Sequence, residues 1–280
     1  MEDRTAAPRR RPAGAGSVRS AVGRWLRFLV LLVVTALVLV PVLVPGWRLV
    51  AGTPTGSSGR WAGLVATVAG TLRGAPVLTW LSNSLLVTAV TVVVSIALAA
   101  PAGYVVSRGR GRAVRGFALL IFALQAAPIL LCMISLFVMF SALGLGDTLR
   151  GATLVYIGLS VAVATWTMSS YFDSIPVELE EAAWIDGCSV FGGFARVVLR
   201  NSLPGVLSAA VYAFLFTWND YWIALVFLRS DVNYTIGLAL AGPGSSTVVA
   251  VIAMLPPLVI FGVLNRYFSI GGIGGALAGR

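Results

Sequence analysis

The sequence predicts an all-α integral membrane protein with six transmembrane helices, and three observations support this fold class. Of the 280 residues, 58% are hydrophobic and only 11% are charged, with a mean hydropathy of +0.94. In soluble domains about a quarter of the residues are charged. Six apolar stretches are each long enough to cross a hydrocarbon core of about 30 Å. The arginines are concentrated in alternate connections between these stretches, as is typical of a multi-pass membrane protein.

The first 79 residues contain one of the six stretches. Residues 1–24 hold six arginines among Ala, Gly and Pro without apolar periodicity, which predicts a disordered basic cytoplasmic tail. Residues 25–47 are predicted to be the first transmembrane helix, because the uncharged run from Phe28 to Trp47 is too long for a signal peptide. Residues 48–79 are rich in Gly, Thr and Ser, and are predicted to form an extracytoplasmic loop.

The other five spans fall within residues 80–268, which we predict to be one transmembrane domain. They lie near residues 83–106, 115–143, 151–172, 203–228 and 246–265. Residues 269–280 are predicted to be a Gly-rich cytoplasmic tail.

The distribution of the arginines predicts the orientation. With the N-terminus inside, 15 of the 20 arginines face the cytoplasm and 5 face outward. This excess places both termini and the polar segment at 174–205 in the cytoplasm.

Residues 174–205 form the most polar part of the chain between two spans. They contain four of its ten acidic residues, namely Glu178, Glu180, Glu181 and Asp186. We expect a segment with this charge density to lie in water.

Local signals within this segment predict a helix–turn–helix. Asp173 or Ser174 can cap a first helix, whose acidic residues suit its N-terminal dipole. Gly187 can adopt the left-handed conformation that ends that helix, and Ser189 can cap a second one running to about Leu199.

Ala182 and Ala183 leave the middle of the first helix without bulk. The surface of another protein could therefore approach its backbone closely. Glu181 would lie at the edge of such a contact, available to an arginine of that protein.

Several kinds of site are excluded or disfavoured by composition. The chain has no lysine and no histidine, so it cannot form a phosphate-binding loop of the GxxxxGK[ST] type, and any ATPase must be another chain. A zinc site or a Ser/His/Asp triad is not expected, and neither is a disulfide between Cys132 and Cys188. The net charge of +10 comes from arginines that flank apolar spans, which indicates topology signals and not nucleic-acid binding.

Trp218, Asn219 and Asp220 interrupt the fifth predicted span with a carboxylate. An ionisable group at membrane depth is a functional-site hypothesis, here a place on a substrate pathway. Asp220 could equally be a structural hydrogen-bond acceptor between helices, or lie near the outer interface among aromatic residues. The sequence leaves both interpretations open.

The polar segment resembles the cytoplasmic coupling loop of binding-protein-dependent ABC importer permeases. The resemblance is carried by Glu181, Ala182, Ala183, Ile185, Asp186, Gly187, Ser189, Phe194, Leu199, Pro204 and Gly205. The family usually has a proline directly after the position of Leu199, where this chain has Arg200. The Trp-Asn-Asp group, followed by Ala224 to Leu228, is similar to the six-span permease subunit of the carbohydrate branch.

This resemblance implies a type I ABC importer permease fold, with the polar segment as its coupling loop. It further implies that the chain lies in the bacterial cytoplasmic membrane and translocates a sugar or sugar derivative. The ATPase-coupling residues would be Glu178, Glu181, Ala182, Ala183, Asp186, Gly187, Phe194 and Pro204.

The partners implied are a second homologous permease, an ABC ATPase dimer, an extracytoplasmic solute-binding protein and membrane lipid. ATP and Mg would bind to the ATPase, and this chain would bind no cofactor of its own. Two alternatives stay open: an ion- or proton-coupled secondary transporter, and an importer permease for a solute other than a sugar.

Overall fold

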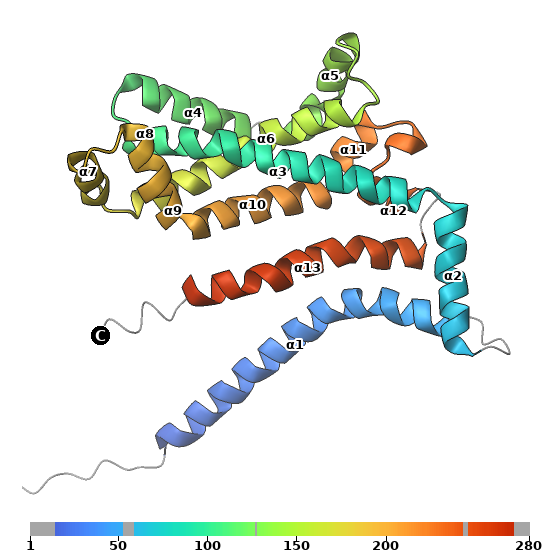
Figure 1. Cartoon of the computed structure of the whole chain (residues 1–280). Coiled ribbons are helices and arrows are strands. Elements are labelled where there is room, and N and C mark those ends of the chain that lie inside the picture. The colour runs from blue at the N-terminus through green and yellow to red at the C-terminus, as the bar shows by residue number, and fades with distance from the viewer. Residues whose placement is uncertain (1–14, 53–58, 127, 243–245, 272–280) are drawn as a thin grey trace, which may run out of the picture. The chain divides into compact units, whose positions relative to one another are not determined.

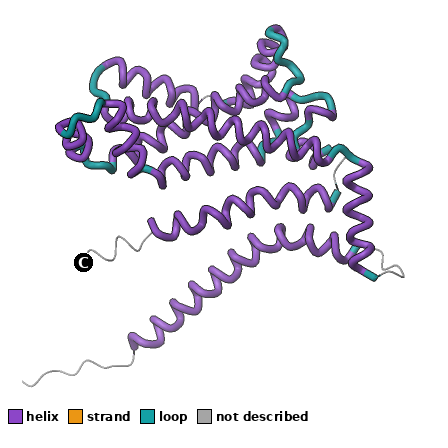
Figure 2. Tube along the Cα trace, viewed as in Figure 1, coloured by secondary structure: helices purple, strands orange, loops and turns teal. Residues whose placement is uncertain are grey.

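The computed structural model describes residues 15–52, 59–126, 128–242 and 246–271, and the regular elements among them are all helical (Figures 1 and 2). The elements are α1 (Ala15–Ala51), α2 (Arg60–Gly74), α3 (Val77–Arg108), α4 (Arg112–Ala126), α5 (Ile129–Ala142), α6 (Leu149–Asp173), α7 (Glu178–Ile185), α8 (Val190–Gly193), the π-helical turn η1 (Phe194–Val198), α9 (Leu199–Asn201), α10 (Leu203–Trp218), α11 (Trp222–Phe227), the 3-10 turn η2 (Asp231–Asn233), α12 (Ile236–Ala241) and α13 (Thr247–Gly271). The all-α prediction is confirmed for these residues.

The chain divides into two compact units, Met1–Leu64 and Val65–Arg280. In the first unit, α1 contains the predicted helix 25–47 but begins at Ala15. The prediction of a disordered tail is therefore wrong for residues 15–24, and its residues 1–14 lie outside the described residues.

Two other predicted boundaries differ from the structure. The predicted loop at 48–79 contains α2, because its Leu and Val residues recur often enough among the Gly and Thr to continue a helix. The predicted tail at 269–280 begins inside α13, and its residues 272–280 are outside the described residues.

The second unit is built on α3 and α6, which run in the same direction along one another, with α10 beside both (Figure 1). Small residues allow this close packing. A Cβ added to Gly103 of α3 would lie 3.0 Å from the Thr165 carbonyl oxygen of α6. Ala99 and Ala164 are each fully buried.

Among the described residues, three helices are long and apolar enough to cross a membrane. These are Val77–Arg108, Leu149–Asp173 and Thr247–Leu264. A fourth span is possible if Val190–Asn201 and Leu203–Trp218, bent by 75°, are counted as one. The predicted number of six spans stays a prediction.

The span predicted at 115–143 is two helices in the structure, α4 and α5. Pro128 precedes the first residue of α5 and has an extended ψ of 90°. Proline has no N–H to donate to a preceding helical turn. The expected continuous helix is therefore interrupted.

The span predicted at 203–228 is also interrupted, because α10 ends at Trp218 and α11 begins at Trp222. The Asp220 carboxylate accepts hydrogen bonds from the amides of Ile223 and Ala224, at 2.9 and 3.2 Å. A side chain that captures these amides begins a new helix where hydropathy predicts a continuous one.

Candidate functional site

The polar segment forms the predicted helix–turn–helix at one end of α3 and α6 (Figure 1). Its turn is centred on Gly187, which has the left-handed φ of +88°. The Cys188 amide donates to the Ala183 carbonyl at 2.9 Å, and the Gly187 amide donates to Trp184 at 3.0 Å. This is the Schellman pattern of helix termination. The predicted role of Gly187 in the turn is confirmed.

The predicted cap of the first helix is wrong. Asp173 and Ser174 end α6: the Ser174 hydroxyl donates to the Tyr171 carbonyl, and the Asp173 carboxylate accepts from Ser107. The first helix, α7, begins at Glu178 after Val177, and no side chain caps it. Two hydrogen bonds at the end of α6 thus compete successfully with the expected cap.

The second helical part begins as predicted. The Ser189 hydroxyl accepts from the Gly192 amide at 3.1 Å, and α8, η1 and α9 continue the helix to Asn201. Gly193 permits close packing against α7, because an added Cβ would lie 2.8 Å from the Trp184 indole nitrogen. Pro204 lies in the first turn of α10, where a missing N–H has no consequence.

Glu180 is the residue of this segment that the sequence analysis missed. Its side chain is 1% exposed and forms an ion pair with Arg108, with 2.7 Å between Nη2 and Oε1. The Tyr104 hydroxyl donates to the other carboxylate oxygen, Oε2, at 2.7 Å. Helical spacing could have indicated its position, because Glu180 lies off the face shared by residues 178, 181, 182 and 185.

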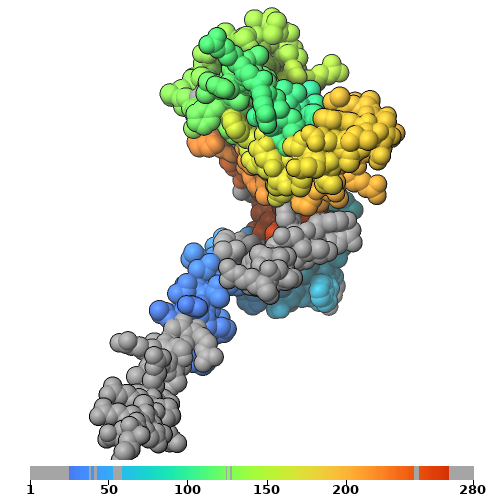
Figure 3. Space-filling model, turned by 90° about the vertical axis from the view of Figure 1, so that its left-hand side faces the viewer, coloured from blue at the N-terminus to red at the C-terminus, as the bar shows by residue number. Residues whose placement is uncertain are grey.

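The remaining α7 residues form a solvent-exposed face that is acidic and apolar. Glu178, Glu181 and Ala182 are exposed, and Ile185 on the same face is 86% exposed. At the start of α8, Phe191 is 76% exposed. Figure 3 views the molecule from this end, with residues 174–205 in yellow to orange on the surface.

This outward surface suits contact with another protein. Exposed large apolar side chains on a water-facing segment mark interaction sites when they occur together. Of the predicted coupling residues, Glu178, Glu181 and Ala182 lie on it, and Ala183 is partly buried. Phe194 does not: it is 8% exposed, with its ring 4.9 Å from that of Tyr104 between centroids.

The second predicted group, Trp218 to Asp220, lies at the α10–α11 break. The Trp218 indole donates to the Ala253 carbonyl at 3.1 Å, and the Asn219 amide donates to Leu215 at 3.0 Å. The Asp220 carboxylate also accepts from the Tyr156 hydroxyl at 2.8 Å. These contacts give Asp220 a structural role, and a place on a substrate pathway stays a prediction.

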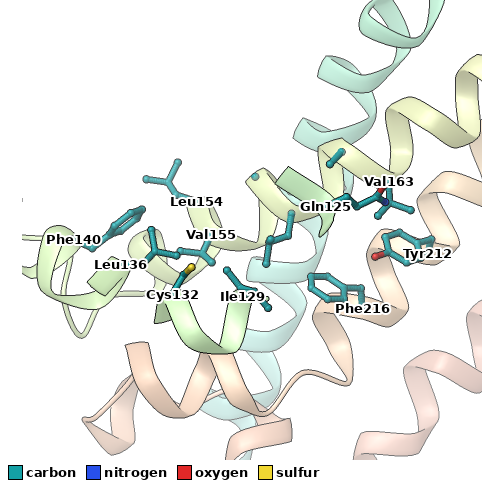
Figure 4. A pocket seen from close by; sticks show the side chains of 13 residues that line it. Gln125, Ile129, Cys132, Leu136, Phe140, Leu154, Val155, Val163, Tyr212 and Phe216 are labelled. Atoms are coloured by element: carbon teal, nitrogen blue, oxygen red, sulfur yellow. The ribbon is translucent and has the colours of Figure 1, made fainter. Parts of the chain in front are cut away.

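A cavity of about 530 Å³ lies between α4, α5, α6 and α10 (Figure 4). Its wall is mostly aliphatic and aromatic carbon, with the Gln125 amide and the Tyr212 hydroxyl as polar groups. None of the three residues at the α10–α11 break lines it. So few polar groups suit apolar contact better than recognition of a sugar, which needs many hydrogen bonds.

Asp147 lies at the opposite end of α6, in the connection between α5 and α6. Its carboxylate accepts hydrogen bonds from the amides of Arg229 and Ser230 at 2.8 and 3.1 Å, and from the Ser230 hydroxyl. Burial alone would raise the pKa of Asp147, but hydrogen bonds from Ser230, Arg229 and Asn233 outweigh it and lower the pKa to about 2. Asp147 thereby fixes the connection between α11 and α12.

No three His, Cys, Asp or Glu side chains in the described part of the chain are grouped so that they could hold a metal ion. The described part of the chain is built of helices, several of them apolar enough to cross a membrane, and its helix–turn–helix has an exposed acidic and apolar face.

The chain belongs to the family described as "Binding-protein-dependent transport system inner membrane component", whose sequence profile matches residues 96–270. It is thus a transport subunit of the inner membrane and not an enzyme, and the predicted membership of the ABC importer permeases is confirmed.

Relatives agree with this assignment. The trehalose transport system permease protein SugB of Mycobacterium tuberculosis is 32% identical over 224 residues, 75% of this chain and 80% of its own length. The maltodextrin transport system permease protein MdxG of Bacillus subtilis is 30% identical over 211 residues, 72% of this chain and 76% of its own.

A solved structure has the same fold. It is a crystal structure of a bacterial ABC transporter involved in the import of the acidic polysaccharide alginate. The match has a TM-score of 0.72 and 20% identity, and covers 92% of this chain and all of the other.

Proposed function

We propose that this chain is a permease subunit that translocates a sugar or sugar derivative by ATP-driven alternating access. Relatives named for trehalose and maltodextrin transport support the substrate class. The observation that carries the mechanism is the outward face of α7 and α8, an acidic and apolar surface on a helix–turn–helix whose inner side is fixed to the membrane domain. A segment of this kind can receive a displacement from a soluble partner.

The partners in this proposal are a second related permease, two copies of an ABC ATPase and an extracytoplasmic solute-binding protein. ATP and Mg bind to the ATPase, and this chain contributes no cofactor. Glu181 makes a charge-assisted contact with an ATPase arginine, while Ala182 lets that surface approach the backbone. Within the described residues, Glu181 forms no ion pair of its own.

Six spans with both termini in the cytoplasm form part of the same proposal. Since α3 and α6 run in parallel, the intervening α4 and α5 together must return across the bundle. The Asp147 amide donates to the Phe227 carbonyl at 3.1 Å, so α10 with α11 also runs from the α7 end to the opposite end. These crossings, together with α13 and α1, make six.

The proposed orientation rests on the 15 arginines that it places inside. In a chain with Cys132 and Cys188 replaced, a cysteine at 112 should react with an impermeant reagent only after permeabilisation. A cysteine at 60 should react from outside. Reversed labelling would contradict the orientation.

Two other functions are less well supported. In an ion-coupled carrier Asp220 would be the coupling carboxylate, but it is held by Tyr156 and two amides, and the family assignment concerns binding-protein-dependent systems. A solute other than a sugar is tested by reconstituting the importer with its binding protein. Oligosaccharides should stimulate ATP hydrolysis, and stimulation by peptides or amino acids alone would reject the sugar assignment.

The decisive experiment for coupling is Glu181→Lys, with recruitment of the ATPase as the measurement. A charge-assisted contact is worth about 1.5–3 kcal/mol, so recruitment should fall roughly ten- to a hundredfold. The second permease should still co-purify. Asp231→Lys is the matched control, because Asp231 is an exposed acid at the other end of the bundle. Full recruitment with Glu181→Lys would reject the assigned contact.

A further inference from the structure

The last turn of α3 contacts three successive parts of the chain: the end of α6, the connection that follows it, and α7 in the polar segment at 174–205. Tyr104, Ser107 and Arg108 lie on one helical face, at spacings of three and four residues. Ser107 donates to Asp173 at the end of α6, at 2.5 Å, and Arg108 donates to the Ile175 carbonyl at 2.9 Å. The end of α3 is thus joined both to α6 and to the connection that follows it.

The contact with α7 is the buried one. Arg108 donates to Oε1 of Glu180 through Nε at 2.8 Å, and its Nη2 lies 2.7 Å from the same oxygen. With Tyr104 on Oε2, both carboxylate oxygens are occupied. Glu180 is 1% exposed and Arg108 is 18% exposed, so little water screens the pair.

Aromatic packing attaches the second half of the segment to the same place. The Tyr104 ring lies 6.4 Å from Phe172 of α6 and 4.9 Å from Phe194 of η1, between centroids. Phe194 is buried together with Val198 and Met168. Both helical parts of the segment are therefore held to the ends of α3 and α6.

An eight-residue helix such as α7 is too short to be stable by itself in water. Its position must come from contacts with the rest of the chain. Among these contacts, the arginine–carboxylate pair is directional, because the planar guanidinium fixes the approach of the carboxylate. Glu180 therefore ties the position of α7 to the end of α3.

We propose that the Arg108–Glu180 pair is the positioning contact that makes α7 and the ends of α3 and α6 move as one body. The inference rests on the proposed function, because it assumes that a partner displaces α7. Glu181 would then bind the partner, while Glu180, one residue earlier, would transmit the displacement to the membrane helices.

The test compares Glu180→Gln with wild type in proteoliposomes that contain the complete importer. Three quantities are measured: ATPase recruited per permease, ATP hydrolysed, and solute taken up per ATP hydrolysed. We expect recruitment close to that of wild type and uptake per ATP about tenfold lower, as the loss of one charge-assisted contact would produce. A purely structural role would reduce the amount of complex and leave this ratio unchanged.

Two further variants keep the test decisive if Glu180→Gln accumulates poorly. Arg108→Lys retains the charge, but it replaces the planar guanidinium, which reaches Glu180 and the Ile175 carbonyl through different nitrogens, with a single ammonium nitrogen. We expect uptake per ATP to lie between the values of wild type and Glu180→Gln. The single charge reversals Arg108→Glu and Glu180→Arg should each lower uptake per ATP. The double variant, which exchanges the two charges, should recover part of that loss.

A normal uptake per ATP in Glu180→Gln or in Arg108→Lys would overturn the positioning role. So would a charge exchange that recovers nothing while the complex assembles fully. These outcomes differ from failure of the proposed function, in which the wild-type chain itself would recruit no ATPase.

Discussion

The two ends of α6 each hold a carboxylate, but by different means. At one end Glu180 is buried and bonded to two side chains, Arg108 and Tyr104. At the other end Asp147 is partly exposed and bonded mainly to backbone amides and a hydroxyl of residues 229–230. The Glu180 end leaves an acidic and apolar outer face free for a partner.

The two carboxylates therefore have different consequences: Asp147 holds one connection in place, whereas Glu180 can transmit a displacement of α7 to α3. Every residue except proline has a backbone N–H, so Asp147 can fix this connection with little dependence on which side chains lie opposite it. Glu180 depends on one arginine 72 residues earlier. Losing either charge of a buried ion pair is costly, since the remaining charge would be buried without compensation.

The largest expected effect is that of Arg108→Leu, which leaves the Glu180 carboxylate buried without its cation. Losing one partner of a buried pair typically costs about 3–5 kcal/mol of stability. The measurement is denaturant unfolding of the purified chain in detergent. Arg112→Leu is the matched control, because Arg112 is exposed in the next turn of chain. If the two variants unfold at the same denaturant concentration, the pair contributes nothing.

Asp147→Ala should have a smaller effect at the other end. It removes an ionised acceptor of amide and hydroxyl hydrogen bonds, but these bonds are exposed and water can replace them, so we expect a total loss of about 1.5–3 kcal/mol. Asp147 also has a φ of 51°, a conformation that alanine adopts less readily than aspartate or asparagine. Asp147→Asn should therefore recover part of the loss. A larger loss than that of Arg108→Leu would reverse the comparison between the two ends.

The local part of the coupling segment could be predicted from the sequence, because its signals are short-range. Gly187 and Ser189 specify the turn and the second cap within a few residues, and the structure has both. The role of Glu180 could not be predicted, since its partners lie in α3, 72 and 76 residues earlier in the chain. Its place off the common helical face was the available signal.

The two broken spans have a similar explanation. Hydropathy averages over a window and therefore predicts continuous helices at 115–143 and 203–228. Pro128 and Asp220 act on single backbone groups, one by lacking an N–H and the other by accepting two. A proline or an aspartate in an apolar run is thus better evidence for a break than mean hydropathy is for continuity.

Acid should weaken the Asp147 end selectively. The pKa of Asp147 is about 2 in the folded protein, below the ordinary value of 3.8, so folding favours its deprotonated form. The stabilisation is complete above about pH 5 and is lost progressively as the pH falls through about 2. The difference in unfolding midpoint between wild type and Asp147→Asn should therefore narrow between pH 5 and pH 2. A difference that stays constant would exclude the charge as its cause.

The smallest expected effect is that of Ser107→Ala, which shows whether burial or chemical type sets the cost at the α7 end. Ser107 donates to the Asp173 carboxylate from the same helical turn as Arg108, but this bond is exposed, and water can replace it. We expect a loss of about 0.5–1 kcal/mol in detergent unfolding, and uptake per ATP like that of wild type. If Ser107→Ala lowered that ratio as strongly as Glu180→Gln, every contact of the α3 terminus would transmit displacement, and the buried pair would have no special role.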